Sequence, residues 1–459
     1  MSAKFELDMS RGPILKNIIR FAVPLMLANM LQLCYNAADI IVVSRFAGSD
    51  ATASVGASSP IINLLINFFI GISVGGSVVV SRRYGAHDDE GIHRAVHTSM
   101  LLGLFVSVLV LIIGEFFAKT FLVYLGTPEG KVLNGAVIYM RIYLIGIPAS
   151  LIYNFGSAIL RAIGDTKRPL YILAISGLIN VVLNLIFVIV FGMGVEGVAI
   201  ATAVSNYVSM ILILYALIGA DSTYKLTIKE LRIYKKELAE ILKIGVPAGV
   251  HSSVFSLSNV LIQSAVNSFG KAAIAAGTAC GNIEGFIYAV KNSFAQATLT
   301  SVSQCYGAKD EKRMKKCVRV SLLSMLIGGA ALCILVTVFS RQLLGIYITD
   351  SAEAIDYGVK RMIITGLPYF VGGIMEVLTA YLRGLGYSSI STMNSIIGVC
   401  GFRMFWVFII FPIYRSYEVL YLCWVISWII VIIMHTISLK VVKKKAIENM
   451  HKACTEENL

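Results

Sequence analysis

The chain has 459 residues, of which 57% are hydrophobic and only 14% are charged. Soluble domains are about one quarter charged, so this composition excludes a soluble globular protein and indicates a chain that crosses a membrane many times. The formal net charge of +13 would suit a nucleic-acid partner, but the basic residues gather in the connections between apolar segments, and no nucleic-acid binding is expected.

Twelve apolar stretches are each long enough to cross a bilayer, which takes about 20 helical residues. They lie at residues 14–44, 53–81, 95–118, 132–160, 169–191, 195–219, 238–267, 273–304, 318–340, 353–382, 388–412 and 417–439. The first stretch is too long for a cleaved signal peptide and lacks a small-residue cleavage site, so it is expected to remain as the first span. The sequence thus predicts an all-α integral membrane protein with twelve transmembrane helices embedded in the lipid bilayer.

The basic residues are distributed unequally between the two sides of these spans. Of the 39 Lys and Arg residues, 28 lie in the amino-terminal segment, in every second connection and in the tail. The other connections hold only nine: Arg45, Lys119, Lys131, Arg141, Lys271, Arg341, Lys360, Arg361 and Arg415. Because Lys and Arg are retained on the cytoplasmic side, we expect a multi-pass protein of the plasma or inner membrane with both termini in the cytoplasm.

The two halves of the chain repeat each other. The segment YGAHDDEGIHRA at Tyr84 recurs as YGAKDEKRMKKC at Tyr306, and LRAIGD at Leu160 recurs as LRGLGY at Leu382, both 222 residues later. Six spans in each half make the repeats parallel, and we expect a pseudo-two-fold axis along the membrane normal. The predicted parts are an N-terminal six-helix lobe (1–220), a cytoplasmic linker (221–240), a C-terminal six-helix lobe (241–440) and a cytoplasmic tail (441–459).

The sequence offers no source of chemical energy and no enzymatic centre. It lacks the G-x-x-x-x-G-K-[ST] motif and has no soluble segment long enough for a nucleotide-binding domain. Its eight cysteines form no C-x-x-C pair, and no metal-ligand cluster is expected from its six histidines. We therefore predict a secondary transporter rather than an enzyme, without a resident cofactor, that works by alternating access of its two halves.

The same landmarks resemble the multidrug and toxic compound extrusion (MATE) family over almost the whole chain, from about Pro13 to Lys440. They are the doubled YGA, LRAIGDTKRP after the fourth span, MEVLTAYLRGLGYS around the tenth, and VPLMLANMLQLCYNAADIIVVSRFAG in the first. The resemblance implies an antiporter, coupled to H⁺ or Na⁺, that exports amphipathic and cationic organic compounds. It also implies a V-shaped arrangement of two lobes, and we expect a monomer.

Asp39 is the only charged residue between Phe21 and Val43. It precedes Arg45 by six residues, or about 9 Å of helix rise, which places it in the outer half of the membrane. A carboxylate there should face the protein interior and have partners. Asn180 and Asn184 share one face of the fifth span, and Thr202 lies in the sixth.

The resemblance implies that these four residues form the cation site, with Asn184 where the family commonly has a second Asp. Asp39 either exchanges a proton or, with the neighbouring oxygens, binds Na⁺. The alternative is a neutral Asp39 that only packs helices.

The second half has its own ionisable set: Glu284, Lys291, Glu376 and Arg403. Glu284 precedes Lys291 by two helical turns on one face. Two interpretations stay open. Either Glu284 pairs with Lys291 and Glu376 with Arg403, which only holds the lobe together, or Glu376 binds substrate or protons, as the family's acidic residue in the tenth span implies.

Five further residues could line an amino-terminal substrate cavity, although ordinary helix packing explains each of them as well: Gln32, Tyr35, Asn36, Tyr139 and Asn154. The competing functions are a flippase of lipid-linked saccharide precursors from the same superfamily and a membrane scaffold. A flippase should carry a cavity rich in Arg and Lys, whereas only Lys291 and Arg403 are placed deep in the spans by the sequence. We therefore predict the antiporter.

Overall fold

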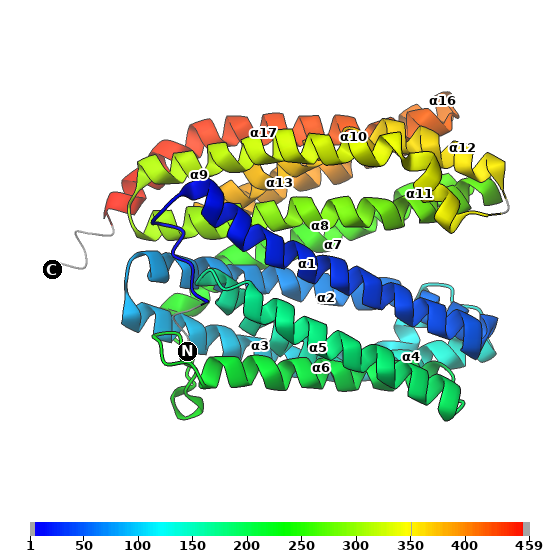
Figure 1. Cartoon of the computed structure of the whole chain (residues 1–459), viewed down its shortest axis with the longest axis horizontal. Coiled ribbons are helices and arrows are strands. Elements are labelled where there is room, and N and C mark those ends of the chain that lie inside the picture. Colours follow the sequence, from blue (N-terminus) through cyan, green and yellow to red (C-terminus); the bar gives the residue numbers. More distant parts are fainter. Residues whose placement is uncertain (1–4, 350, 453–459) are drawn as a thin grey trace. The chain divides into compact units, whose positions relative to one another are not determined.

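A computed structural model describes residues 5–349 and 351–452 (Figure 1). The end of the predicted cytoplasmic tail, residues 453–459, lies outside the described residues. The rest of that tail continues the last helix, and its Val442 and Ala446 are buried in a hydrophobic cluster with Leu439. In the described part of the chain all regular structure is helical.

The first half contains six long helices, two of which end in π-helical turns. They are α1 (Ile14–Val42) with η2 (Val43–Ala47), α2 (Ser49–Gly85), α3 (Asp89–Tyr124), α4 (Lys131–Ala162), α5 (Lys167–Leu185) with η3 (Ile186–Val190), and α6 (Val195–Ile218). In this half α4 packs against α2, α3 and α6, and α5 packs against α6.

The second half begins with the short η4 (Ile228–Glu230) and is interrupted more often. It contains α7 (Lys235–Asn267), α8 (Lys271–Gly307), α9 (Glu311–Ser324), η5 (Met325–Gly329), α10 (Ala330–Val338), α11 (Ser340–Tyr347), α12 (Ala352–Arg361), η6 (Met362–Gly366), α13 (Tyr369–Gly384), α14 (Ser388–Ser395), η7 (Ile396–Gly401), α15 (Phe402–Phe405), η8 (Trp406–Ile410), α16 (Phe411–Ile413) and α17 (Tyr417–Lys452). Here α13 packs against α8 and α17, and α8 also packs against α12.

The predicted spans correspond to these helices. Among the described residues, eleven helical stretches are long and apolar enough to cross a membrane. The twelfth helix is α7, whose 33 residues include the polar run HSSVFSLSN and therefore fall short of the same apolar criterion. The protein is thus an all-α, multi-pass membrane protein with twelve helical spans.

The chain forms two compact units, and their bounds differ from the predicted division at residues 220 and 240. The first unit runs to Leu7 and resumes from Leu27 to Gly249, and the second comprises Asp8–Met26 and Val250–Leu459. The first turns of α7 belong to the first unit because they pack closely on α2. A Cβ atom added to Gly71 would lie only 2.3 Å from the Cα atom of Gly249, so the two backbones touch.

The repeated YGA segment forms the same turn in each unit. His87 and Lys309, three residues after Tyr84 and Tyr306, both adopt the left-handed conformation, with φ of 55° and 58°. The aspartate that follows then caps a helix: Asp88 accepts a hydrogen bond from the Gly91 backbone N–H, and Asp310 accepts one from the Arg313 backbone N–H, each at 2.8 Å. The sequence repeat therefore encodes a turn and a helix start.

Replacing Asp310 by Ala should lower the free energy of unfolding by about 1 kcal/mol, because the first turn of α9 loses its side-chain acceptor. Chemical denaturation in detergent, followed by intrinsic fluorescence, measures the change. Asp310→Asn retains a side-chain oxygen and should lose much less. Equal losses for the two variants would contradict the capping role.

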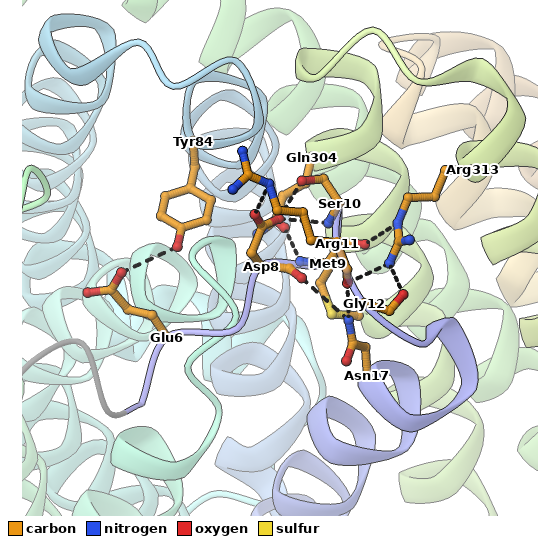
Figure 2. A network of polar contacts seen from close by, with 10 residues as sticks. All are labelled: Glu6, Asp8, Met9, Ser10, Arg11, Gly12, Asn17, Tyr84, Gln304 and Arg313. Atoms are coloured by element: carbon orange, nitrogen blue, oxygen red, sulfur yellow. Dashed lines mark hydrogen bonds and ion pairs between the residues drawn. The ribbon is translucent and has the colours of Figure 1, made fainter.

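The described segment before α1 is divided between the two units, and each part forms hydrogen bonds within its own unit (Figure 2). In the first unit, Glu6 accepts a hydrogen bond from the Tyr84 hydroxyl at 3.3 Å. In the second unit, the Met9 N–H donates to Gln304 Oε1 at 2.7 Å, and the Arg313 guanidinium donates to the carbonyl oxygen of Met9 at 3.0 Å. Because these contacts order the segment, α1 begins from a fixed position in the second unit.

Candidate functional site

The structure brings together the four residues predicted for the cation site. Asp39 lies near the end of α1, and its Oδ1 accepts a hydrogen bond from Asn184 Nδ2 of α5. One turn earlier in α5, Asn180 Oδ1 lies 3.4 Å from Asn184 Nδ2, and Asn180 Nδ2 lies 3.4 Å from the hydroxyl oxygen of Thr202 in α6. Three helices of the first unit thus supply one continuous polar chain.

These linked polar side chains are largely buried, which is unusual for side chains of membrane-spanning helices. Asn184 is completely buried, Asn180 is 5% exposed and Asp39 is half-buried. Asn184 Oδ1 is a buried acceptor that has no hydrogen-bond partner among the described residues. A buried polar atom without a partner is costly, and a bound cation would remove that cost.

The available atoms fit Na⁺. They are the Asp39 carboxylate, the amide oxygens of Asn180 and Asn184 and the Thr202 hydroxyl, and hard cations prefer oxygen ligands of this kind. The same geometry also fits a proton, since Asp39 is the only carboxylate of the set and could take it up directly. These residues could therefore bind either Na⁺ or a proton.

The five residues predicted to line a cavity are placed in different ways. Tyr139 is buried in a hydrophobic cluster with Val42 and Val195. Tyr35 packs its ring over Gly177 and donates its hydroxyl to the Ala174 carbonyl at 3.2 Å. The remaining three lie as follows: Asn154 bonds to the Ser150 carbonyl of its own helix, whereas Gln32 and Asn36 are exposed on α1 and bond to each other.

In the second unit Glu284 has a different partner from the one expected. It forms a two-pronged ion pair with Arg361, with Nε–Oε1 and Nη2–Oε2 distances of 3.2 and 2.6 Å, and it accepts a third hydrogen bond from Thr365 at 3.0 Å. The pairing of Glu284 with Lys291 is therefore wrong. So is the placement of Arg361 in an outer connection, because Arg361 is the last residue of α12 and is only 7% exposed.

The predicted pairing of Glu376 with Arg403 is also not formed, since no described carboxylate lies within 4.0 Å of the Arg403 guanidinium. Arg403 instead stacks on Trp424, with its Cζ 4.1 Å from the ring centre. Lys291 lies over aromatic rings, and Glu376 is half-buried on α13. The sequence did not identify Arg361 as the partner of Glu284. Its spacing of four residues from Thr365, which places both side chains on one helical face, was the available indication of a shared buried partner.

Two histidines and a glutamate come together in the first unit, a grouping that the sequence did not predict. His93 and His97, one turn apart on α3, place ring nitrogens within 4.8 Å of a Glu230 oxygen, the spacing of a metal-ligand group. However, both ring nitrogens of the buried His97 already have backbone neighbours: Nδ1 lies 2.8 Å from the His93 carbonyl, and Nε2 accepts from the Thr227 N–H at 3.1 Å. The group therefore joins the connection before α7 to α3 through hydrogen bonds.

Comparison with known proteins extends the resemblance found in the sequence. The family model MatE matches residues 24–186 and 247–409, one match for each half. A probable multidrug resistance protein of Bacillus subtilis, YoeA, is 30% identical over 402 residues, which cover 85% of this chain and 86% of that protein. An FAD transporter of Shewanella oneidensis is 24% identical, with 74% of this chain and 75% of that protein covered.

The fold is shared with solved structures as well. A multidrug resistance MATE family transporter in its outward-facing conformation superimposes with a TM-score of 0.86, at 24% identity, over 97% of this chain and 98% of that one. The duplicated helices, the matching family model over both halves and the similarity to YoeA lead to one conclusion: the chain belongs to the MatE family of membrane transporters and is not an enzyme.

Proposed function

We propose that this protein is a multidrug efflux antiporter that exports amphipathic organic compounds by alternating access, driven by inward movement of H⁺ or Na⁺. The observation that carries the proposal is the Asp39 carboxylate beside the unpaired, buried Asn184 Oδ1. The kinship with YoeA supports the drug-efflux part of the proposal. The protein would act as a monomer in the plasma or inner membrane, with both termini in the cytoplasm.

The single negative charge of Asp39 would couple ion movement to export of the organic compound. Asp39 stays charged only while a cation or a charged partner compensates it, because an isolated carboxylate is disfavoured inside a membrane protein. Binding of the coupling ion then neutralises the site and lowers the cost of changing between the two accessible states. An outgoing cationic compound could compete for the same carboxylate. Asn184 in place of a second carboxylate limits the site to one such charge.

Efflux of a fluorescent cationic dye from vesicles that contain the purified full chain tests the proposal. A pH gradient alone and a Na⁺ gradient alone are applied in separate runs, with protein-free vesicles as the control. We expect one gradient to drive efflux well above the control, which also names the ion. No efflux with either gradient, over a panel of dyes, would contradict the antiporter.

A flippase of lipid-linked saccharide precursors is the second candidate. One observation favours it, since the structure adds Arg361 to the two cations that the sequence placed deep in the second half. The ion pair with Glu284 compensates that third charge, so the antiporter remains the better supported function. Movement of a labelled lipid-linked saccharide across the same vesicles, without an ion gradient, would favour the flippase.

A further inference from the structure

The interior of the second unit holds more cations than anions. Its buried charged side chains, among the described residues, are three cations and one carboxylate: Lys291, Arg361, Arg403 and Glu284. Glu284, the one fully buried carboxylate among the described residues of this unit, is taken up by its ion pair with Arg361. Lys291 and Arg403, which are 2% and 1% exposed, are therefore left without a buried counter-charge. Burying charge without compensation is strongly unfavourable, so such a pair of cations calls for an explanation.

Lys291 is surrounded by aromatic rings. Its Nζ lies 4.9 Å from the ring centre of Tyr369, 5.0 Å from that of Tyr288 and 6.0 Å from that of Trp428. No carboxylate oxygen in the described part of the chain comes within 4.0 Å of it; the half-buried Glu376 of α13 acts on Lys291 only from a longer distance. Aromatic faces attract an ammonium group, but they offer no acceptor for its three N–H groups.

Arg403 is only partly bonded. Its Nε donates to Ser427 Oγ at 3.3 Å and its Nη1 to Asn259 Oδ1 at 3.2 Å, whereas Nη2 is buried and has no hydrogen-bond partner among the described residues. The Nε1–H groups of Trp424 and Trp428 are buried and unpaired in the same way. These two indoles lie one turn apart on α17 with ring centres 6.1 Å apart; one stacks on Arg403 and the other faces Lys291.

The four side chains Lys291, Arg403, Trp424 and Trp428 thus form one cation–indole cluster. Every open polar atom in it is a hydrogen-bond donor, so its complement must bring acceptors and negative charge. We propose that this cluster binds the carboxylate or phosphate group of an amphipathic organic molecule, whose apolar or aromatic body packs on the surrounding rings. The inference rests on the proposed function for its ligand, a transported compound, and it extends the substrate class from cations to organic anions and zwitterions.

Calorimetric titration of the purified full chain in a neutral detergent tests this inference. The probes are 1-naphthyl phosphate and 1-naphthoate, compared with the cation 1-naphthylmethylammonium and the neutral 1-naphthylmethanol. We expect the two anions to bind with affinities about tenfold or more above those of the cation and the alcohol, since charge-assisted hydrogen bonds favour them. Equal affinities for all four probes would overturn the proposal.

Substitutions within the cation–indole cluster test whether the anions bind there. Lys291→Gln and Arg403→Gln should each weaken anion binding about tenfold or more, whereas Lys271→Gln, which removes one exposed charge from the same helix as Lys291, should not. Trp428→Phe keeps an aromatic ring, although a smaller one, and removes the N–H group, so a weaker loss of anion binding is expected. This variant tests the site if a charge variant does not fold. Unchanged anion affinity in all three cluster variants would exclude this site.

Melting temperatures measured in nanodiscs of two lipid compositions distinguish an anionic lipid headgroup from a free organic anion as the ligand of the cluster. If the cluster holds an anionic lipid, phosphatidylglycerol should raise the melting temperature of the wild type relative to phosphatidylcholine, and Lys291→Gln should remove that increase. If it holds a free organic anion, naphthyl phosphate should produce the increase in phosphatidylcholine. No increase in either membrane would contradict the site. Because no gradient is used, this failure would leave the antiport test unaffected.

Discussion

Replacing Asp39 by Asn should reduce gradient-driven efflux by about 100-fold or more without unfolding the protein. Asn has the shape of Asp and can still bond to Asn184, but it can neither take up a proton nor balance the charge of a bound cation. The coupling ion then no longer changes the charge of the site. Without that change the imposed gradient cannot favour one accessible state over the other.

Efflux of the fluorescent dye from reconstituted vesicles, with the effective ion gradient, measures this loss. Asp89→Asn is the matched control, since it removes an exposed carboxylate from the first turn of α3 and should leave efflux unchanged. Melting temperatures in detergent show whether each variant is folded. Efflux at the wild-type rate in Asp39→Asn would move coupling to the second unit, where Glu376 has no ion-pair partner within 4.0 Å among the described residues.

Replacing Arg361 by Gln should lower the free energy of unfolding by about 3–5 kcal/mol. The substitution leaves the buried Glu284 carboxylate with only the Thr365 hydroxyl as a described partner. It also removes the hydrogen bonds from Nη1 to the Gly277 carbonyl at 3.0 Å and to the Tyr421 hydroxyl at 3.1 Å, which join α12 to α8 and α17.

Chemical denaturation in detergent measures the loss, and a double variant separates its causes. Glu284→Leu with Arg361→Met removes both charges and should recover much of the stability, because the penalty arises from one uncompensated charge. The exposed ion pair of Arg341 with Asp356 provides the control, and Arg341→Gln should have little effect. If Arg361→Gln unfolds like the wild type, the buried pair does not stabilise the second unit.

The sequence alone predicted the helical, multi-pass architecture and the shared landmarks of the two halves. These properties are local: the length and apolarity of each segment determine whether it can cross a bilayer, and the YGA segment forms its turn and cap within a few residues. The cluster around Asp39 was also predictable. One charged residue in an apolar span needs polar partners, and Asn180 and Asn184 on one helical face were conspicuous candidates.

Only the tertiary structure decided which charges pair. Glu284 and Arg361 are 77 residues apart, and their contact depends on the rotation and crossing of α8 and α12, which hydropathy does not encode. The choice of Arg361 as the partner of Glu284 leaves Lys291 among aromatic rings, without an ion pair within 4.0 Å in the described part of the chain. Partner choice between distant helices therefore determines the character of the second unit's interior, because in a medium of low dielectric constant each charge is governed by the few groups that touch it.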